Sequence, residues 1–256
     1  MHITRRDFLK FSGAGIAFLS LPQNLWAKTT SIPVLMYHDI SSQFVDDYTV
    51  SPSLFSAQME WLHSMGYHTL FFSEAESFIE KNNDRAVIIT FDDGYASILD
   101  YAFPLLKEYG FKATVNIIGK HTGAFIKLGG NRPLLSWDEY RYLGDSGLID
   151  LGCHTHNLHS RRLAADFSES LLEEDLKGFQ EILKQETGKR TEILAWPYGI
   201  YTGKSIAIAE KAGFRYILTS NEGYLRKESS LLEIPRLNIN DKLDLISFQQ
   251  YLGESS

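Results

Sequence analysis

Short apolar runs recur along the chain and alternate with longer segments in which apolar and polar residues are mixed. Short runs rich in β-branched and aromatic residues and bounded by turn signals are typical of buried strands. The pattern therefore predicts strands at 33–38, 68–71, 87–91, 114–118, 150–153, 193–195, 216–218 and 232–234.

The longer segments show the spacing of amphipathic helices. The clearest one spans 168–187, where Leu172, Leu176 and Phe179 form one apolar stripe. Apolar residues three or four positions apart lie on one face of a helix, so this face is expected to pack on the core. Gly188 follows the last turn and ends the helix. Further helices are expected at 52–65, 73–82, 95–109, 137–146 and 203–212.

Four predicted helices are each followed by a glycine, an apolar or aromatic residue and then a predicted strand. The glycines are Gly66, Gly110, Gly147 and Gly213. Glycine closes a helix because it readily adopts the left-handed conformation, and the next apolar residue packs back on the last turn. Repeated helix-to-strand units without a linker-like stretch predict a single α/β domain with a largely parallel, barrel-like sheet.

The first 27 residues differ from the rest and resemble an export signal. Arg5 and Arg6 precede Phe-Leu-Lys, a short apolar stretch and a small-residue end, which is similar to a bacterial twin-arginine signal. The stretch is rich in glycine and serine and is interrupted by Pro22, so no stable membrane span is expected in the mature chain. We predict a signal at 1–27, a domain at 28–256 and a periplasmic or extracellular location. An amphipathic first helix of the domain is the alternative.

Composition narrows the partners of the chain. The formal net charge of −7 argues against nucleic acid or an anionic membrane surface as the main partner. Cys153 is the single cysteine, so no disulfide can form within the chain. It directly precedes His154, and alternation along a strand predicts that its side chain packs behind any site built around that histidine.

Polar side chains follow three of the predicted strands at their carboxyl ends. His38 closes the first strand, Asp92 and Asp93 close the third, and His154 closes the fifth. In parallel α/β folds this rim is where binding and catalytic sites are built. Two aspartates before a glycine are also typical of a turn or a helix cap, which is the alternative interpretation.

Three histidines, His154, His156 and His159, crowd the segment after the fifth strand. Taken singly they would be ordinary surface histidines, but together with a carboxylate on the same rim they indicate a metal site. A carboxylate beside a metal ligand supplies the base that a hydrolytic site needs. We therefore interpret the chain as a metal-dependent hydrolase, with His156 either a spare ligand or a solvent-exposed residue.

The segment 90–95, Thr-Phe-Asp-Asp-Gly-Tyr, resembles the signature of the polysaccharide deacetylases, carbohydrate esterase family 4. The resemblance implies a distorted (β/α)7-type barrel in a single domain. It implies that Asp92 is the general base and that Asp93, His154 and His159 bind one divalent metal ion. Two histidines and an aspartate suit Zn²⁺, although Ni²⁺, Co²⁺ and Fe²⁺ accept the same ligands.

Four further features resemble the poly-β-1,6-N-acetylglucosamine deacetylases of biofilm systems: the five-residue spacing of the histidine pair and the segments 33–40, 50–67 and 195–199. This resemblance implies that His38 is the general acid and that the backbone N–H of Tyr198 meets the oxyanion. The arginine that usually precedes Pro-Tyr-Gly and holds the base is replaced here by Ala195-Trp196. Arg236, after the last predicted strand, is the candidate substitute.

Aromatic residues in the expected rim loops are candidates for contact with sugar rings. We single out Tyr95, Trp196 and Tyr198, for which ordinary packing is the alternative. The expected function is an exported hydrolase that removes N-acetyl groups from N-acetylglucosamine-containing polysaccharide and releases acetate. Peptidoglycan or chitin-type oligomers, or small amides, are alternative substrates. A carbohydrate-binding module derived from an inactive enzyme is a further alternative, against which the retained Asp92 and His38 argue.

Overall fold

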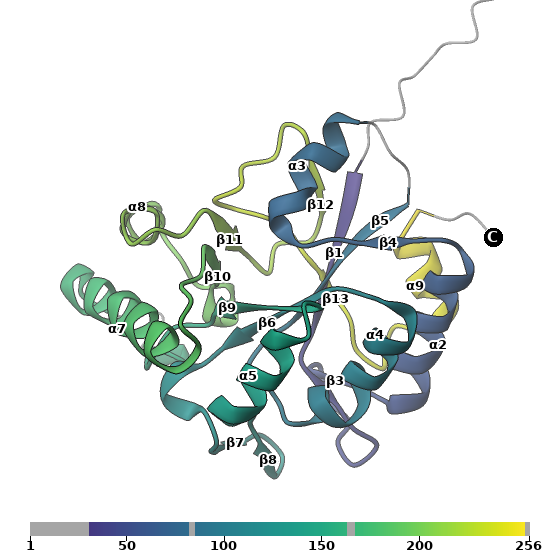
Figure 1. Cartoon of the computed structure of the whole chain (residues 1–256), viewed down its shortest axis with the longest axis horizontal. Helices are drawn as coiled ribbons and strands as arrows, with labels where there is room; N and C mark the ends of the chain where they lie inside the picture. The colour runs from purple at the N-terminus through teal and green to yellow at the C-terminus, as the bar shows by residue number, and fades with distance from the viewer. Residues whose placement is uncertain (1–30, 82–84, 163–166, 254–256) are drawn as a thin grey trace, which may run out of the picture.

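The computed structural model describes residues 31–81, 85–162 and 167–253. The export signal predicted at 1–27 lies outside the described residues. In the described part, helices surround a curled, mostly parallel sheet (Figure 1). None of the helices in these ranges combines the length and the apolar character needed to cross a lipid bilayer.

The main sheet contains β1 (Ser31–Tyr37), β4 (His68–Thr69), β5 (Ala86–Phe91), β6 (Ala113–Ile117), β9 (Ile149–Cys153), β10 (Ile193–Ala195), β11 (Tyr216–Leu218), β12 (Tyr224–Arg226) and β13 (Leu237–Asn238). Their order is β11-β10-β9-β6-β5-β1-β12, with β13 also paired to β1 and β4 to β5. All of these pairings are parallel except that of β1 with β12. The predicted strands are confirmed with one exception, and the architecture is a distorted (β/α)7-type barrel in one domain.

The exception is the strand predicted at 232–234, which is wrong. Ile234 forms only an isolated bridge with Leu218 of β11, and the strand β13 starts three residues later. Pro235 has no N–H to donate to a ladder, which explains the interruption. The segment still closes the curled sheet, because it bridges to β11 at one edge and pairs with β1 at the other. Arg236 lies between these two contacts.

Side chains of β5 alternate between two environments. One face of β5 carries Val87, Ile89 and Phe91, which pack in a hydrophobic cluster shared with most of the helices, called the outer cluster below. On the opposite face, Ile88 belongs to a second hydrophobic cluster. Alternate residues of a strand share a face, so the residue at position 92 continues the face of Ile88. The sheet is therefore buried on both faces, as parallel sheets usually are.

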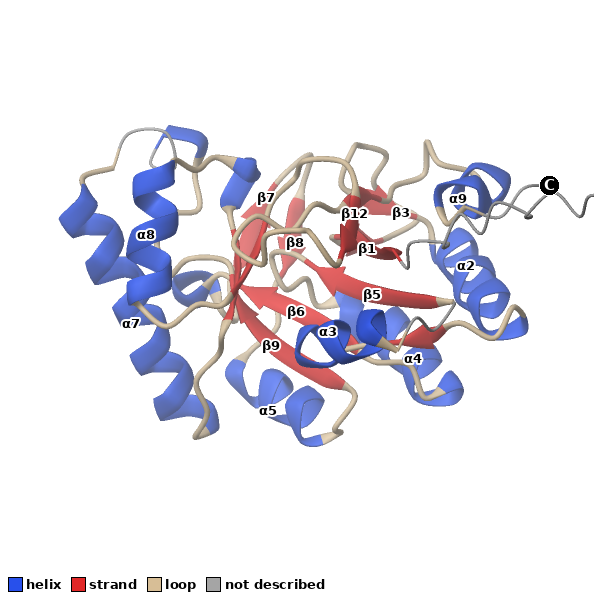
Figure 2. Ribbon diagram, turned by 90° about the horizontal axis from the view of Figure 1, so that it is seen from above, coloured by secondary structure: helices blue, strands red, loops and turns tan. Residues whose placement is uncertain are grey.

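The helices that contribute to the outer cluster are α2 (Pro52–Ser64), α4 (Phe103–Tyr109), α5 (Trp137–Asp145), α7 (Glu169–Thr187), α8 (Gly203–Lys211) and α9 (Leu245–Tyr251). They lie around the outside of the sheet (Figures 1 and 2). The helix α3 (Phe72–Glu80) instead packs Phe72 and Ala75 against the opposite face. The expected helices are confirmed at their approximate positions, whereas α9 was not predicted.

The helix predicted over 95–109 is shorter and divided. Residues Ile98–Ala102 form a π-helical turn, and α4 begins at Phe103. Pro104 explains the division, because proline lacks the N–H that a helix interior needs and fits only the first turn. The residues directly after β5 therefore form a loop at the rim of the sheet.

The four predicted helix-to-strand joints are confirmed. Gly66, Gly110, Gly147 and Gly213 all have a positive φ, between 66° and 96°. This left-handed conformation strains other residues but not glycine, and it turns the chain from each helix into the next strand.

Two short strand pairs stand above the rim, β2 (Asp39–Ile40) with β3 (Thr49–Val50) and β7 (Phe125–Lys127) with β8 (Asn131–Pro133). Neither pair was predicted. Arg132 of β8 joins them: its guanidinium donates to Asp39 Oδ2 at 3.2 Å, to Thr49 Oγ1 at 2.9 Å and to the carboxylate of Asp46. The side chain of Arg132 is 1% exposed, so one buried cation fixes this wall of the rim.

Replacement of Arg132 by methionine is expected to lower the free energy of unfolding by about 3–5 kcal/mol, because it leaves the buried carboxylate of Asp39 without its cation. Urea unfolding followed by circular dichroism measures the change. Arg141→Met is the matched control: Arg141 is half exposed and pairs with Asp138 and Glu186, so about 1 kcal/mol or less is expected. Equal losses of stability in the two variants would contradict the role of Arg132 in joining the two short strand pairs.

Candidate metal centre

Asp92 and Asp93 directly follow β5 and point in different directions because the chain turns between them. Asp92 still donates its N–H to Tyr37 O of β1 at 2.9 Å, whereas Asp93 has φ = 70°, in the left-handed region. A non-glycine residue in this region is strained and is held there by its surroundings. The turn sends the two adjacent carboxylates to different partners.

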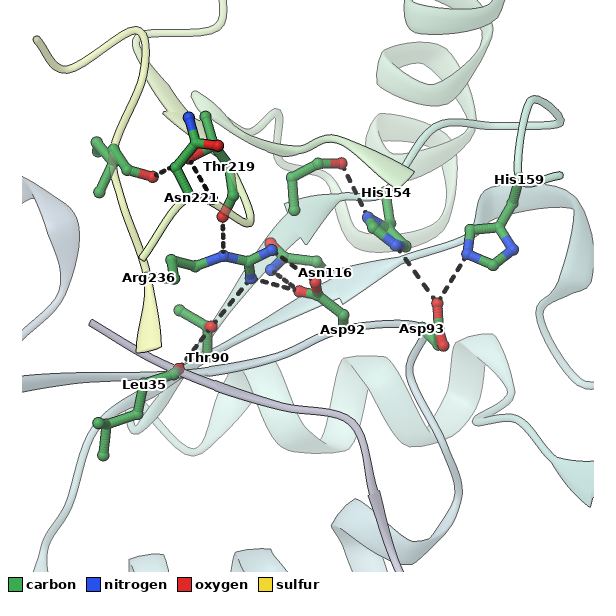
Figure 3. Close-up of polar contacts among 12 residues, drawn as sticks. Leu35, Thr90, Asp92, Asp93, Asn116, His154, His159, Thr219, Asn221 and Arg236 are labelled. Carbon is green, nitrogen blue, oxygen red and sulfur yellow. Dashed lines mark hydrogen bonds and ion pairs between the residues drawn. The ribbon is translucent and has the colours of Figure 1, made fainter. Parts of the chain in front are cut away.

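Asp93 lies beside two histidines that come from the end of β9. Its Oδ1 is 3.4 Å from His154 Nε2 and 3.0 Å from His159 Nε2 (Figure 3). One ligand atom from each residue lies within 4.8 Å of the other two, as a shared metal ion requires. The structure thus brings these three side chains together, and His156 is not one of them.

The hydrogen bond on the far side of His154 supports a cation at this point. Its Nδ1 lies 2.8 Å from the carbonyl oxygen of Ala195. A carbonyl oxygen only accepts, so Nδ1 carries a hydrogen, and Nε2 is the ring atom that binds a metal ion when the ring is neutral. Nε2 lies 3.4 Å from Asp93 Oδ1, so a metal ion placed beside both atoms can bind to the two of them. The donor set therefore fits a divalent metal ion with open positions.

The pKa shifts of Asp93 and His154 also favour positive charge at this point of the site. Burial alone would raise the pKa of Asp93, but His159 and His154 hold it well below its ordinary value. Burial would lower the pKa of His154, yet the carboxylates of Asp92 and Asp93 raise it. The pocket therefore stabilises positive charge next to Asp93.

Asp92 is held by a different set of donors. Arg236 binds both of its oxygens, with Nη1–Oδ1 and Nη2–Oδ2 distances of 2.8 Å, and Asn116 Nδ2 donates to Oδ1 at 2.7 Å (Figure 3). The guanidinium is itself fixed by Thr219 O and Thr90 Oγ1. Burial would raise the pKa of Asp92, but Arg236 and His154 bring it far below its ordinary value. The carboxylate is therefore ionised and rigidly oriented.

Asn116 was missed in the sequence, although a signal existed: it is a polar residue inside the apolar strand β6. Its neighbour in the sheet is Gly152 of β9. A Cβ on Gly152 would lie 2.1 Å from Asn116 Oδ1 and 3.1 Å from Ile193 Cγ2. Glycine at this position therefore leaves the space that the Asn116 side chain occupies beside Asp92.

His38 lies at the end of β1 and is 8% exposed. Its ring meets that of Tyr48 edge-on, with 5.2 Å between the centroids. Burial lowers the pKa of His38, while the carboxylates of Asp92 and Asp93 oppose this shift. Asp39 follows in sequence but pairs with Arg132 and Ser97, so it points away from the site, as expected.

The aromatic candidates differ in how accessible they are. Tyr198 has φ = 58° and is 39% exposed, and its ring lies 5.0 Å from that of His159. Tyr95 is 1% exposed and Trp196 is 2% exposed, with its ring parallel to that of Tyr201. Of these three candidates, only Tyr198 is exposed, and the guanidinium of Arg161 lies 5.4 Å from the centre of its ring.

The predicted site residues lie around one cleft of about 610 Å³. The sequence-predicted residues that line it are His38, Asp92, Asp93, Tyr95, His154, His159, Trp196, Tyr198 and Arg236. Residues of the unpredicted wall, among them Tyr48 and Leu128, line it as well. A second hollow of about 660 Å³ lies elsewhere, around Tyr67 and Lys112, and the three-residue ligand cluster is not part of it.

Two further residues next to the proposed histidine ligands, Cys153 and His156, do not belong to the ligand cluster. Cys153 is fully buried in the outer cluster and, as expected, does not enter the site; burial raises the pKa of its thiol. His156 is neither a ligand of the cluster nor solvent-exposed, which corrects that expectation. It is partly buried against Gly119, whose added Cβ would meet His156 Nδ1 at 2.6 Å.

Gly152→Ala is expected to lower the free energy of unfolding by about 1–3 kcal/mol, because the new methyl group displaces Asn116 and overfills a packed region. Thermal and urea unfolding measure this loss. The matched control is Gly144→Ala in α5, where the new Cβ would meet Leu151 only at ordinary contact distance. There we expect no loss, and a gain of up to about 1 kcal/mol from helix propensity. Unchanged stability in Gly152→Ala would refute the proposed close approach.

The family model described as polysaccharide deacetylase matches residues 79–217, more than half of the chain. The poly-β-1,6-N-acetyl-D-glucosamine N-deacetylase of Staphylococcus epidermidis is 30% identical over 207 residues, which cover 78% of this chain and 71% of that protein.

Two solved structures are similar over most of their length. The deacetylase PplD of Streptococcus pyogenes, solved in complex with acetate, is 25% identical, with a TM-score of 0.76 over 88% of this chain and 99% of that chain. IcaB from Ammonifex degensii is also 25% identical, with a TM-score of 0.77 over 88% of this chain and 97% of that chain. Each of these chains is covered almost completely by the domain described above.

Proposed function

Because the chain belongs to the polysaccharide deacetylase family, whose hydrolases act on N-acetyl amides, we propose that it removes N-acetyl groups from N-acetylglucosamine polymers in a metal-dependent reaction. The single observation that carries the proposal is the convergence of Asp93, His154 and His159 next to an ionised, oriented Asp92. Two histidines and a carboxylate are a common ligand set of catalytic zinc. An inactive binding module would have no need of a buried base beside such a set.

We assign the ion to Asp93, His154 and His159, with Zn²⁺ as the first candidate. A divalent ion bound there would lower the pKa of a water molecule and polarise the acetamide carbonyl group. Asp92 accepts a proton from the attacking water, and its ionised state and fixed orientation suit it for this. Arg236 takes the place of the arginine missing before Pro197 and keeps the base in position.

Two groups complete the proposed reaction. The backbone N–H of Tyr198, at the turn with positive φ, donates to the oxygen that becomes negative as water adds to the carbonyl carbon. His38 then supplies a proton to the nitrogen as the C–N bond breaks, because an amine cannot leave as its anion. Acetate and a free sugar amine are the products.

The substrate class is proposed from the cleft and from the relatives. The exposed ring of Tyr198 offers a surface on which a sugar ring can stack. The relative from Staphylococcus epidermidis is named for poly-β-1,6-N-acetylglucosamine, and we propose the same polymer here. Residues 1–27 are proposed to export the enzyme to the periplasm or the cell exterior, where such polymers are accessible.

Asp92→Asn is expected to lower the rate of acetate release by about 100-fold or more, because the amide cannot take a proton from water. Bound zinc, measured by atomic emission, is expected to stay near one ion per chain, since Asp92 is not a proposed ligand. Residual activity close to wild type would remove Asp92 from the role of base. Loss of zinc together with activity would instead place it among the ligands.

Removal of the ion by a chelator is expected to abolish acetate release, and added Zn²⁺ is expected to restore it. The assay uses a panel of β-1,6-linked N-acetylglucosamine oligomers, chitin oligomers, peptidoglycan fragments and simple acetamides. Release from the first substrate well above the others supports the proposed polymer. Full activity after rigorous demetallation refutes the metal-dependent reaction, and preference for simple amides refutes the polysaccharide substrate.

A further inference from the structure

The two proposed histidine ligands differ in how they are held. His154 lies at the end of β9, donates its N–H to Ile117 O at 2.8 Å and is oriented by Ala195 O. His159 lies five residues further on and reaches the cluster through a loop. The start of that loop, Thr155, has φ = 66°, which only the surrounding contacts can maintain.

One carboxylate binds the backbone of this loop. Asp175, on α7, accepts hydrogen bonds from the N–H groups of His156 and Asn157, at 2.8–3.1 Å to its two oxygens. Asp175 is 7% exposed, although it stands on a helix whose other buried residues are mainly apolar. A buried charge needs such donors, so the loop and the carboxylate stabilise each other.

The opposite side of the loop is held by the segment after β6. Gly119 donates its N–H to Thr155 O at 3.1 Å, and Lys120 donates to His156 O at 2.8 Å. The His156 ring fills the space between Gly119 and Gly178, which lies one turn after Asp175 on α7. The loop is therefore held between the segment after β6 and the helix α7, directly before the residues that lead to His159.

We propose that Asp175 is a positioning residue of the metal centre, which fixes the loop so that His159 meets Asp93 and His154. This inference rests on the proposed ligand set. It assigns a role to a carboxylate outside the cleft, and it explains how a histidine pair with five-residue spacing can converge on one ion. Removal of such a residue from the surroundings of a metal site typically weakens metal binding by about 10- to 100-fold.

The test is the affinity for Zn²⁺ alone, measured by competition with a chromophoric chelator on the full chain. Asp175→Ala and the nearly isosteric Asp175→Asn are both expected to raise the Kd by about 10- to 100-fold, with Asn the milder change because it keeps one acceptor. Glu174→Ala, a neighbouring exposed carboxylate on α7, is the matched control and is expected to leave the Kd unchanged. Circular dichroism confirms that each variant is folded.

A double-mutant cycle with His159→Ala separates positioning from a general loss of structure. If Asp175 acts through His159, the effect of Asp175→Asn on the Kd disappears when His159 is already removed. An undiminished effect in that background overturns the inference. So does a wild-type Kd in both folded Asp175 variants.

Hydrogen exchange of the metal-free protein gives a readout that needs neither metal nor activity. The amides of His156 and Asn157 are expected to lose protection in Asp175→Asn, while those of β9 keep it. Unchanged protection overturns the inference even where the Ala variant does not fold. If wild-type protein fails to bind Zn²⁺ at all, the proposed metal centre fails instead, so the two failures are distinguishable.

Discussion

Two adjacent carboxylates must stay ionised in a buried cleft, and the rest of the site follows from how each is compensated. A buried charge is tolerated only where opposite charge or hydrogen-bond donors replace the lost water. Asp92 obtains both from Arg236 and Asn116, which leave it rigid and ionised. Asp93 lies against two histidine nitrogens, and these three residues form a ligand set that fits a cation. One turn of the backbone thus separates the proposed base from the proposed metal ligand.

Backbone strain is concentrated where this separation is made. Asp93, Thr155 and Tyr198 all have a positive φ, and each follows the end of a strand on the same rim. A non-glycine residue adopts this conformation only where its neighbours enforce it. The structure supplies the enforcement from outside the cleft, through Asp175 for the histidine loop, while Arg132 secures the wall that carries Tyr48.

The closure of the barrel is the second requirement of the site. Arg236 is far from Asp92 in the sequence and reaches it because the segment around it bridges β11 and β1. Ala195 and Trp196 stand directly before Pro197, and the bidentate contact with Asp92 is made by Arg236, which follows Ile234 and Pro235.

The sequence by itself determined the helix-to-strand units, the face that each amphipathic helix buries and the strand ends at which Asp92, Asp93 and His154 stand. These are local properties, since periodicity and glycine joints depend on neighbouring residues. The tertiary structure alone decided the contact of Arg236 with Asp92, the placement of Asn116 over Gly152 and the short strand pairs above the rim. Those features depend on residues far apart in the chain, and nothing in local spacing specifies which distant partner satisfies a buried charge.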